Sequence, residues 1–351
     1  MSNLLESYTD KLNFYDLDRE SLSEYLVSNS IPKFRAKQLF EWVYRHQITD
    51  FDQMTNISKE LRDKLKEVFI FPEAEVKSRE ISNDGTRKYL FAVSDKIEVE
   101  SVMIQQEKRM TLCLSSQYGC GMGCTFCRTG TMGFLANLSP SEIMKQVLGV
   151  IKDAKEFNDM FTNIVFMGMG EPLHNHKSLF KVIRILTDPS GLAIAPRKIT
   201  VSTVGLVPAI KKFAEADLGV NLAISLNATN NKVRSEIMPI NDNFPLEVLL
   251  DTVRNFPLKG RKRITFEYVM LKDVNDTLED LKRLIAITRK LPVKINLIPY
   301  NENTGLGFFT PPKSRIYKWQ EVLNSNDISA TIRWSKGQDI NAACGQLKSQ
   351  N

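Results

Sequence analysis

Six short apolar segments, most of them followed by a stretch of helical character, constrain the fold of this chain more than any other feature. Strands that are apolar throughout and alternate with helices are typical of a parallel sheet covered by helices. The helix after the first segment begins with a capping box at Ser139 and Glu142. Six β/α units predict a partial barrel, in which sites lie at the carboxyl ends of the strands. The segments are Met110–Ser115, Asn163–Met167, Lys198–Ser202, Asn221–Ser225, Ile264–Val269 and Lys294–Ile298.

Two smaller parts precede the barrel. About the first seventy residues indicate three helices, the first capped by Asp18 and the others centred near Trp42 and Leu65. Between Arg87 and Ser115 the apolar pattern changes to a period of two, which indicates β-strands. We therefore predict an α/β fold, a partial (β/α)6 barrel with a small helical accessory domain and a β extension. The expected divisions are the helical domain at 1–75, a β-hairpin extension at 76–108, the barrel at 109–340 and a C-terminal tail at 341–351.

The composition excludes several classes of protein. No apolar run approaches the roughly 20 residues that a membrane-spanning helix needs. The N-terminus carries acids and lacks the apolar core of a secretory signal, so we expect a cytoplasmic protein. Five cysteines, four of them within residues 113–127, are then better explained by metal binding or catalysis than by permanent disulfides. The net charge of +6 is compatible with a polyanionic partner but is too small to indicate one.

The strongest signal for chemistry is the segment CGMGCTFC, which places Cys120, Cys124 and Cys127 just after the first barrel strand. Three thiolates on one glycine-containing loop can hold three irons of a [4Fe–4S] cluster and leave the fourth iron open for a ligand. The alternative is a structural zinc site, which normally has four ligands in two separated pairs. The chain has three histidines and no second Cys-x2-Cys pair, and Cys113 lies within a strand. The spacing therefore favours the cluster over zinc.

The cluster segment resembles the radical S-adenosylmethionine superfamily and, with the motifs around it, the bacterial RlmN family. The resemblance covers residues 15 to 347 and rests on segments that follow in order: VESV, LCLSSQYGCGMGCTFC, GMGEPL, VSTVGLVP, ISLNA, RSEIMPIN, INLIPYN and ACGQL. It implies a radical S-adenosylmethionine barrel and an RNA methyltransferase. The expected target is C2 of an adenine in the peptidyl-transferase region of 23S rRNA and of the adenine 3′ to the anticodon in tRNAs. Methylation at C8 of the same ribosomal adenine, as in the related Cfr family, is the alternative.

The same resemblance assigns expected roles to individual residues. Cys120, Cys124 and Cys127 hold the cluster, and Gly170 and Glu171 contact the methionine end of S-adenosylmethionine. Further cofactor contacts are Ser202, Ser225, Leu226, Asn227 and Asn301.

Three more residues are expected to act on the substrate. Cys344 accepts a methyl group, Glu100 accepts a proton, and Cys113 is the second catalytic cysteine. Glu98 is a weaker candidate for the proton acceptor. Without the resemblance, a free cysteine such as Cys344 would be interpreted as a small buried hydrophobe.

The implied reaction consumes two molecules of S-adenosylmethionine. The first methylates Cys344, and cleavage of the second gives a 5′-deoxyadenosyl radical that takes a hydrogen from that methyl group. The new carbon radical adds to adenine C2, Glu100 removes the C2 proton, and Cys113 attacks the Cys344 sulfur to leave a transient disulfide. The implied partners are 23S rRNA, tRNA and an electron donor such as flavodoxin with its reductase. We expect a monomer without membrane association.

Recognition of RNA is the least specified part of the sequence. Two basic runs, at 33–37 and 259–263, are candidates for phosphate contacts while the target adenine is flipped into the barrel mouth. Charge runs are more often solvated faces. The chain departs from the family pattern at Asn227, where many members have histidine, at Arg128, where a smaller residue is usual, and at Ala136, where arginine is common. Two further alternatives remain: a radical enzyme for a small molecule or peptide, and a zinc-stabilised RNA-binding module.

Overall fold

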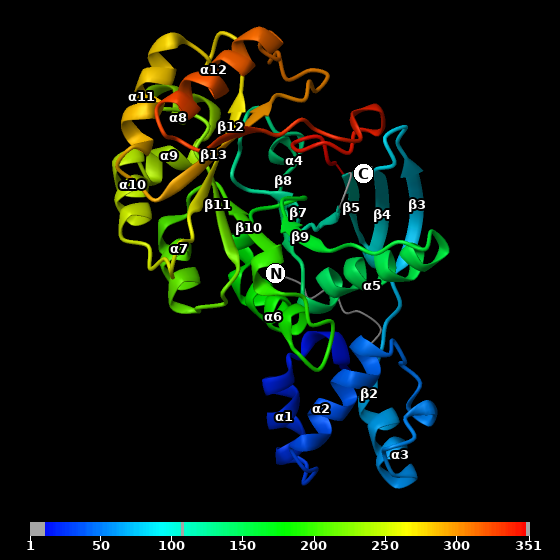
Figure 1. Ribbon diagram of the computed structural model, residues 1–351. Coiled ribbons are helices and arrows are strands. Elements are labelled where there is room, and N and C mark those ends of the chain that lie inside the picture. Colours follow the sequence, from blue (N-terminus) through cyan, green and yellow to red (C-terminus); the bar gives the residue numbers. More distant parts are fainter. Residues whose placement is uncertain (1–10, 107–108, 349–351) are drawn as a thin grey trace, which may run out of the picture.

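A ten-stranded sheet organises the computed structural model, which describes residues 11–106 and 109–348 (Figure 1). The strand order is β14-β13-β12-β11-β10-β9-β6-β5-β4-β3. The outer ends of the expected helical domain and tail, at 1–10 and 349–351, and positions 107–108 of the expected β extension lie outside the described residues. No helix within the described ranges is long and apolar enough to cross a membrane.

The six predicted barrel segments are confirmed as adjacent parallel strands. They are β6 (Arg109–Cys113), β9 (Asn163–Phe166), β10 (Ile199–Thr203), β11 (Asn221–Ser225), β12 (Ile264–Met270) and β13 (Val293–Pro299). A seventh parallel strand, β14 (Ala330–Ile332), pairs with β13. Its three residues are too few to show a period in the sequence. Among the described residues β14 and β3 are the two ends of the sheet order, so the barrel is partial, as predicted.

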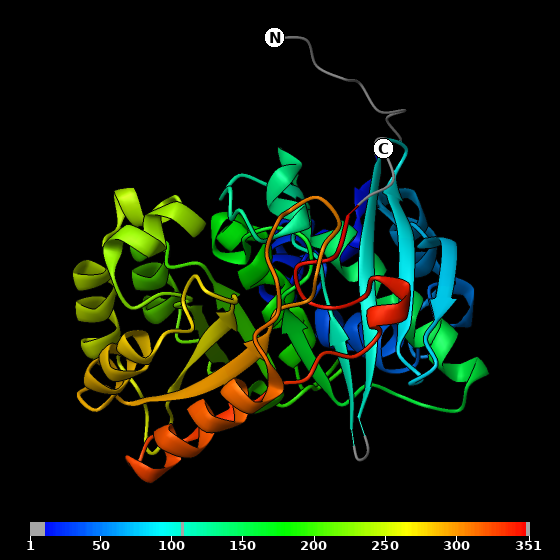
Figure 2. The same cartoon turned by 90° about the horizontal axis from the view of Figure 1, so that it is seen from above.

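Helices follow most of these strands and lie on the outside of the parallel part of the sheet (Figures 1 and 2). The predicted capping box of α5 is confirmed, because the Ser139 hydroxyl accepts from the Glu142 backbone N–H and the Glu142 carboxylate accepts from that of Ser139. The helices are α5 (Pro140–Glu156), α6 (His176–Thr187), α7 (Val207–Glu215), α8 (Asn231–Ile237), α9 (Ile240–Asn243), α10 (Leu246–Arg254), α11 (Leu278–Thr288) and α12 (Lys313–Ser325). Short 3-10 turns are η4 (Pro172–Asn175), η5 (Pro196–Lys198) and η6 (Gln338–Ile340).

Three antiparallel strands extend the sheet beyond β6: β5 (Ile97–Gln106), β4 (Arg87–Ser94) and β3 (Glu75–Ile81). β4 and β5 are predicted, whereas β3 is not. Every residue of β3 is exposed, so neither face of this edge strand selects apolar side chains. The buried side of β4 packs on α5, where a Cβ on Gly149 would lie 2.4 Å from the Phe91 ring. Only a glycine lets the helix approach the sheet this closely.

The three predicted N-terminal helices are also confirmed and lie at the bottom of Figure 1. They are α1 (Arg19–Ser28), α2 (Phe34–Phe40), which continues as the π-helical η2 (Glu41–Arg45), and α3 (Lys59–Val68), with short elements β1 (Leu12–Asn13), η1 (Phe14–Asp16), η3 (Phe51–Gln53) and β2 (Phe69–Ile70). Asp18 caps α1 by accepting from the Ser21 backbone N–H at 2.9 Å. The Asp16 carboxylate accepts from the Ser141 backbone N–H at 2.8 Å and so joins this part to the start of α5.

Candidate active site

The cluster segment lies on a small hairpin that the sequence does not predict. β7 (Gln117–Cys120) pairs with β8 (Gly133–Asn137), and α4 (Arg128–Thr131) lies between them. A Cβ on Gly119, whose φ is +74°, would lie 2.1 Å from the Gly133 carbonyl oxygen, so glycine is required for this pairing. Cys120 ends β7, and Cys124 and Cys127 lie in the turn that leads to α4.

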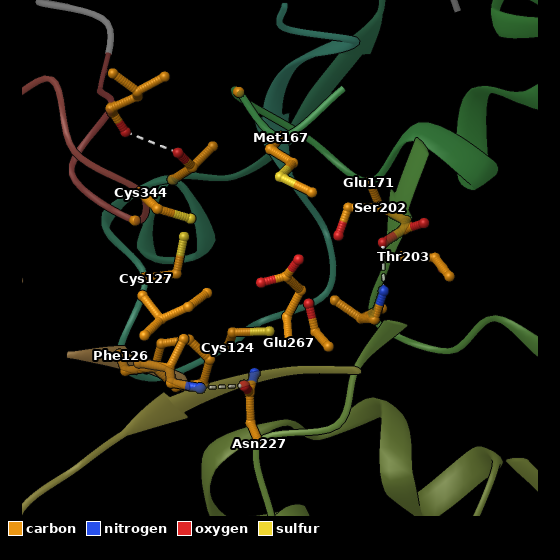
Figure 3. A pocket seen from close by; sticks show the side chains of 18 of the residues that line it. Cys124, Phe126, Cys127, Met167, Glu171, Ser202, Thr203, Asn227, Glu267 and Cys344 are labelled. Carbon is orange, nitrogen blue, oxygen red and sulfur yellow. Dashed lines mark hydrogen bonds between the residues drawn. The ribbon is translucent and has the colours of Figure 1, made fainter. Parts of the chain in front are cut away.

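The carboxyl ends of β9–β13 and the hairpin loop surround a pocket of about 1070 Å³, part of it open to solvent. Residues from β9–β13, the loop and the C-terminal tail line this central pocket. Figure 3 shows the side chains of Glu171, Glu267 and Cys344 among those that point into it. Its wall includes Cys124, Cys127, Gly170, Glu171, Ser202, Ser225, Asn227, Glu267, Asn301, Arg333 and Cys344.

The three cysteines of the loop have free thiols; Cys124 is buried, and Cys120 and Cys127 are partly buried. Burial raises the pKa of Cys120 to about 12 and also raises the pKa of Cys124 and of Cys127. For Cys124, the neighbouring Cys127 and Cys120 thiols raise the pKa further. Buried thiols of this kind lose their protons when they bind a cation, and three soft sulfur donors fit an iron–sulfur cluster. Within residues 11–106 and 109–348, no three His, Cys, Asp or Glu side chains are grouped as ligands of a single metal ion.

Six of the seven expected cofactor contacts line the central pocket: Gly170, Glu171, Ser202, Ser225, Asn227 and Asn301. The exception is Leu226, whose side chain is fully buried in the hydrophobic core. A Cβ on Gly170, whose φ is +98°, would lie 2.4 Å from the Gln117 side chain. Glycine therefore lets β9 continue into the pocket wall close to β7.

Glu171 is a buried carboxylate at the end of this turn. It accepts from the backbone N–H of Leu173 at 3.1 Å and of Val204 at 2.9 Å. Burial raises its pKa to about 7, although these hydrogen bonds oppose the shift. Glu171 therefore changes its charge near neutral pH.

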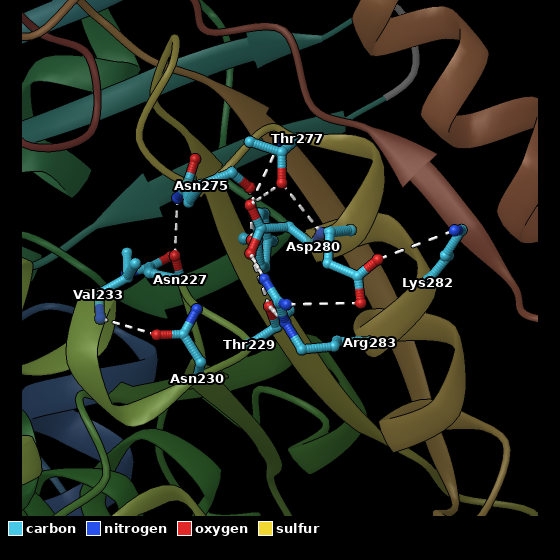
Figure 4. Close-up of polar contacts among 11 residues, drawn as sticks. Asn227, Thr229, Asn230, Val233, Asn275, Thr277, Asp280, Lys282 and Arg283 are labelled. Atoms are coloured by element: carbon cyan, nitrogen blue, oxygen red, sulfur yellow. Dashed lines mark hydrogen bonds and ion pairs between the residues drawn. The ribbon is translucent and has the colours of Figure 1, made fainter.

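Asn227 is fixed from behind by a polar network at the ends of β11 and β12 (Figure 4). Its Oδ1 accepts from the Val269 backbone N–H at 2.8 Å, and its carbonyl accepts from Asn275 Nδ2 at 2.7 Å. Thr229 donates to Asp280 at 2.8 Å and accepts from Arg283 Nε at 3.1 Å. Asn227 thus has its side-chain oxygen occupied by the protein.

The C-terminal tail brings Cys344 to the central pocket, beside Cys127 (Figure 3). The carbonyl of Cys344 accepts from Asn301 Nδ2 at 3.1 Å, and that of Gly345 accepts from the Arg128 backbone N–H at 2.8 Å. The Leu347 carbonyl accepts from the Thr129 hydroxyl at 2.7 Å. Cys344 is exposed, because the pocket is open, yet the protein around its sulfur raises its pKa to about 11.

Cys113 and Cys344 meet at a second, smaller pocket, which we call the side pocket. Its wall is formed by Ile104, Gln106, Cys113, Met167, Arg333, Trp334, Ser335, Lys336, Ala342, Ala343, Cys344 and Leu347. Cys113 is buried at the end of β6, and burial followed by the neighbouring Cys344 raises its pKa to about 12. Both residues carry free thiols. The structure therefore brings together the two cysteines that the sequence separates by more than two hundred positions.

Glu100 lies under the tail and lines neither of these two pockets. Its carboxylate accepts from the Lys348 backbone N–H at 2.7 Å and lies 3.2 Å from the Lys88 ammonium. Burial raises the pKa of Glu100, and Lys88 opposes that shift. Glu98, the weaker candidate, is only partly buried.

Sequence reasoning misses two charged residues of the site. Glu267, in the middle of β12, is 4% exposed and points into the central pocket. Its Oε1 accepts from Asn296 at 3.0 Å, whereas its Oε2 has no partner within the described residues. A carboxylate inside the apolar segment ITFEYVM is the signal that could have identified it.

The second missed residue, Arg234, is fully buried behind the pocket. It donates to the carbonyls of Val204 at 2.7 Å, Leu226 at 3.1 Å and Ser225 at 3.3 Å. No carboxylate of the described residues forms an ion pair with it, and burial lowers its pKa to about 10. Arg234 therefore joins the loops that follow β10 and β11.

The basic run at 259–263 directly precedes β12 and so lies at the amino end of the strand, away from the pocket. Lys259 pairs with Asp217 at 2.5 Å, and Lys262 donates to the Gly219 carbonyl at 2.8 Å. In the other run, Arg35 donates to Gln38 at 2.6 Å. Lys33 and Lys37 are exposed on the N-terminal helices.

Comparisons with known proteins agree over most of the chain. The family model of the ribosomal RNA large subunit methyltransferase N-terminal domain matches residues 12–71, and that of the radical SAM superfamily matches residues 114–285. The dual-specificity RNA methyltransferase RlmN of Pelobacter propionicus is 46% identical over 340 residues, which cover 97% of this chain and 96% of that protein. Its counterpart in Geotalea uraniireducens is 45% identical, with 97% of each chain covered.

One solved structure is similar over nearly its full length. The crystal structure of a radical SAM methyltransferase from Sphaerobacter thermophilus matches with a TM-score of 0.88 and 38% sequence identity. The match covers 96% of this chain and 99% of that chain.

Proposed function

Because the chain belongs to the RlmN family of radical S-adenosylmethionine RNA methyltransferases, we propose that it methylates C2 of one adenine in 23S rRNA and one in tRNA. The dual specificity in the names of its relatives supports both substrates and does not favour the Cfr-like alternative. The observation that carries the proposal is the meeting of the cluster loop and Cys344 at the central pocket. A base in this pocket would be in reach of both.

Membership of this family implies S-adenosylmethionine and a [4Fe–4S] cluster as cofactors. We assign Cys120, Cys124 and Cys127 as the cluster ligands; the bound cluster would supply the electron that cleaves S-adenosylmethionine. Gly170 and Glu171 would hold its methionine end. Ser202, Ser225, Asn227 and Asn301 would line the rest of its site, with the backbone of Leu226. We further propose two molecules of S-adenosylmethionine per turnover, an external electron donor such as flavodoxin with its reductase, and a monomer that acts in the cytoplasm.

Three residues at or near the tail would each perform one step of the reaction on the substrate. Adenine C2 is electron-poor and is unsuited to a direct polar methyl transfer, so a carbon carrier is needed. Cys344 would carry the methyl group at the pocket wall. Glu100, which contacts the tail four residues further on, would take the C2 proton. Cys113 would release the product by attacking the Cys344 sulfur across the side pocket. The new disulfide would replace the bond between that sulfur and the methylene carbon, which would take up a proton and stay on the RNA as the methyl group.

The division of the chain remains part of the proposal. We propose a helical accessory domain at 1–75 that contacts RNA, a β extension at 76–108, the barrel at 109–340 and the methyl-carrying tail at 341–351. The Asp16–Ser141 hydrogen bond supports a fixed position of the accessory domain against α5.

The function is tested with anaerobically reconstituted protein, S-adenosylmethionine, a reductant and an rRNA fragment that contains the target adenine. We expect 5′-deoxyadenosine and 2-methyladenosine to form together, as measured by mass spectrometry of the digested RNA. 8-Methyladenosine alone would show a Cfr-like enzyme. No modified adenine with any rRNA or tRNA substrate, from protein that carries its cluster, would contradict the proposal.

Glu171 gives a prediction for pH. Because its pKa is about 7, its ionised fraction falls about tenfold between pH 8 and pH 6. If the carboxylate accepts from the amino group of S-adenosylmethionine, the affinity for the cofactor should fall over the same range. In Glu171→Gln this carboxylate is absent, so only the other titrating groups, those of the cofactor included, affect the affinity. The ratio of wild-type to variant dissociation constants therefore reports the effect of the Glu171 carboxylate alone. A ratio that does not change with pH would contradict this role.

A further inference from the structure

Two exposed aromatic side chains lie together at the carboxyl end of the sheet edge formed by β14. Tyr317 projects from α12 and is 52% exposed, and Trp334 follows β14 and is 40% exposed. Their ring centroids are 5.9 Å apart with the planes at 53°. The rings are thus not stacked face to face. Adjacent large aromatic residues in contact with solvent are typical of binding surfaces rather than of a free surface.

Three cations surround this pair. Lys313 lies one helical turn before Tyr317, with its ammonium 5.7 Å from the centroid of the Trp334 ring, and Arg333 and Lys336 flank Trp334 in the sequence. Within residues 11–106 and 109–348, none of the three forms an ion pair with a carboxylate. Neighbouring cations differ, since Lys318 pairs with Glu321 at 3.0 Å. The charges of Lys313 and Lys336 are therefore available to an anionic partner, whereas burial raises the pKa of Glu267 and Arg333 lies close enough to that carboxyl to oppose the shift.

Another exposed aromatic residue, Phe157, provides a contrast. Phe157, 41% exposed, lies under Arg87 at 4.2 Å and under Arg79 at 4.9 Å. Both arginines are paired with acids of the protein: Arg87 with Asp159 at 2.6 Å, and Arg79 with Asp153. At that site the aromatic ring is exposed but the cations beside it are already paired with acids, so Phe157 makes a suitable control.

The aromatic pair lies beside the pocket that contains the two substrate cysteines. Arg333, Trp334 and Lys336 belong to the wall of the side pocket, together with Cys113 and Cys344. A segment of chain that places one base at Cys344 would therefore have its neighbouring nucleotides within reach of Trp334. Removing a base from its stack leaves its neighbours without a stacking partner, and aromatic side chains can replace that partner.

Resting on the proposed function, we propose that Tyr317 and Trp334 form a stacking platform for a base next to the target adenine, while Lys313 and Lys336 bind the flanking phosphates. A protein partner with acidic side chains is the competing occupant. The platform favours RNA because ring faces stack on any base and the cations match a phosphate backbone. The target adenine itself would pass over the platform to reach Cys344.

The test is the affinity of the full-length, cluster-loaded protein for a labelled rRNA hairpin that contains the target adenine, measured by fluorescence anisotropy. Trp334→Ala and Tyr317→Ala should each weaken binding about 5- to 150-fold, the range for loss of one base–aromatic stack. Trp334→Phe, which keeps a ring face, should recover most of the loss. Phe157→Ala should bind as the wild type does. Lys313→Ala and Lys336→Ala should each reduce the slope of log affinity against log salt by about 0.7–0.9.

The outcomes distinguish a failure of the platform from a failure of the proposed function. If the wild type methylates RNA and Trp334→Ala binds within twofold of it, the platform is wrong and the proposed function stands. If circular dichroism shows that Trp334→Ala does not fold, the platform is tested with Lys313→Ala and Lys336→Ala instead. The quantity compared is then the slope of log affinity against log salt. Unchanged slopes, or a loss in Phe157→Ala equal to that in Trp334→Ala, would also overturn the platform. A wild type that neither binds nor methylates RNA would overturn the proposed function instead.

Discussion

Replacing Cys344 with alanine is expected to reduce RNA methylation by at least about 1000-fold, the scale of loss when a covalent carrier is removed. The physical reason is that adenine C2 needs a carbon delivered by a radical route, and Cys344 is the exposed thiol in the wall of the central pocket. Cys344 is not among the expected cluster or cofactor ligands. Cluster absorbance and binding of S-adenosylmethionine should therefore stay at the wild-type level.

The measurement is the amount of methylated adenine per enzyme under anaerobic conditions, with cofactor binding measured on the same samples. A sulfur is required rather than a hydrogen-bonding group, so Cys344→Ser should be as inactive as Cys344→Ala. If either variant kept more than a few per cent of the activity, Cys344 would not carry the methyl group. A loss of the cluster in Cys344→Ala would instead point to a structural role in the tail.

Replacing Cys113 with alanine is expected to give a different failure, a protein–RNA adduct that cannot be released. Cys113 borders on the side pocket with Cys344, and no other cysteine lines that pocket. Without its thiolate, nothing attacks the Cys344 sulfur to form the disulfide, so the bond between that sulfur and the methylene carbon on the RNA stays intact. Product should stop at about one equivalent per enzyme or less, and a covalent complex should appear on a denaturing gel.

The double variant Cys113→Ala with Cys344→Ala provides the matched control. It should form no adduct, because the bond to RNA is made through Cys344. Digestion of the trapped complex should leave a nucleotide on the peptide that contains position 344. Multiple turnovers by Cys113→Ala, or an adduct that persists in the double variant, would contradict the assignment of Cys113.

The barrel strands are predictable because burial on both faces makes each one a continuous apolar run. The same reasoning cannot detect β14, which has three residues, or β3, whose seven residues are all exposed. It also misses the β7–β8 hairpin, because the buried residues of β7 are Gln117 and Gly119 rather than apolar side chains. Local periodicity reports burial, so elements that are short or exposed leave no trace in it.

The site divides in a similar way. The cysteine loop is evident from its spacing, and the resemblance supplies Cys344, Cys113 and Glu100. What no local pattern reveals is that β14 delivers Arg333 and Trp334 to the same wall as Cys344. Glu267 is visible as an acid in an apolar strand, but its orientation toward the pocket depends on the register of β12 with its neighbours.

The docking of the tail has an evolutionary consequence. Its anchors are mostly main-chain atoms: the carbonyls of Cys344, Gly345 and Leu347 and the amide of Lys348. Hydrogen bonds to main-chain atoms do not involve the side chains of the anchored residues, but they do depend on the number of residues between the anchors. Inserting or deleting one residue there would displace the sulfur by about 3.5 Å, the length of one extended residue. Substitution is restricted too, because Gly345 has a φ of +80°, Gln346 donates to the Glu302 carbonyl at 3.2 Å and Leu347 is buried. Selection therefore has to preserve the number of residues between Cys344 and Lys348 as well as the glycine, the glutamine and the buried leucine that lie between them.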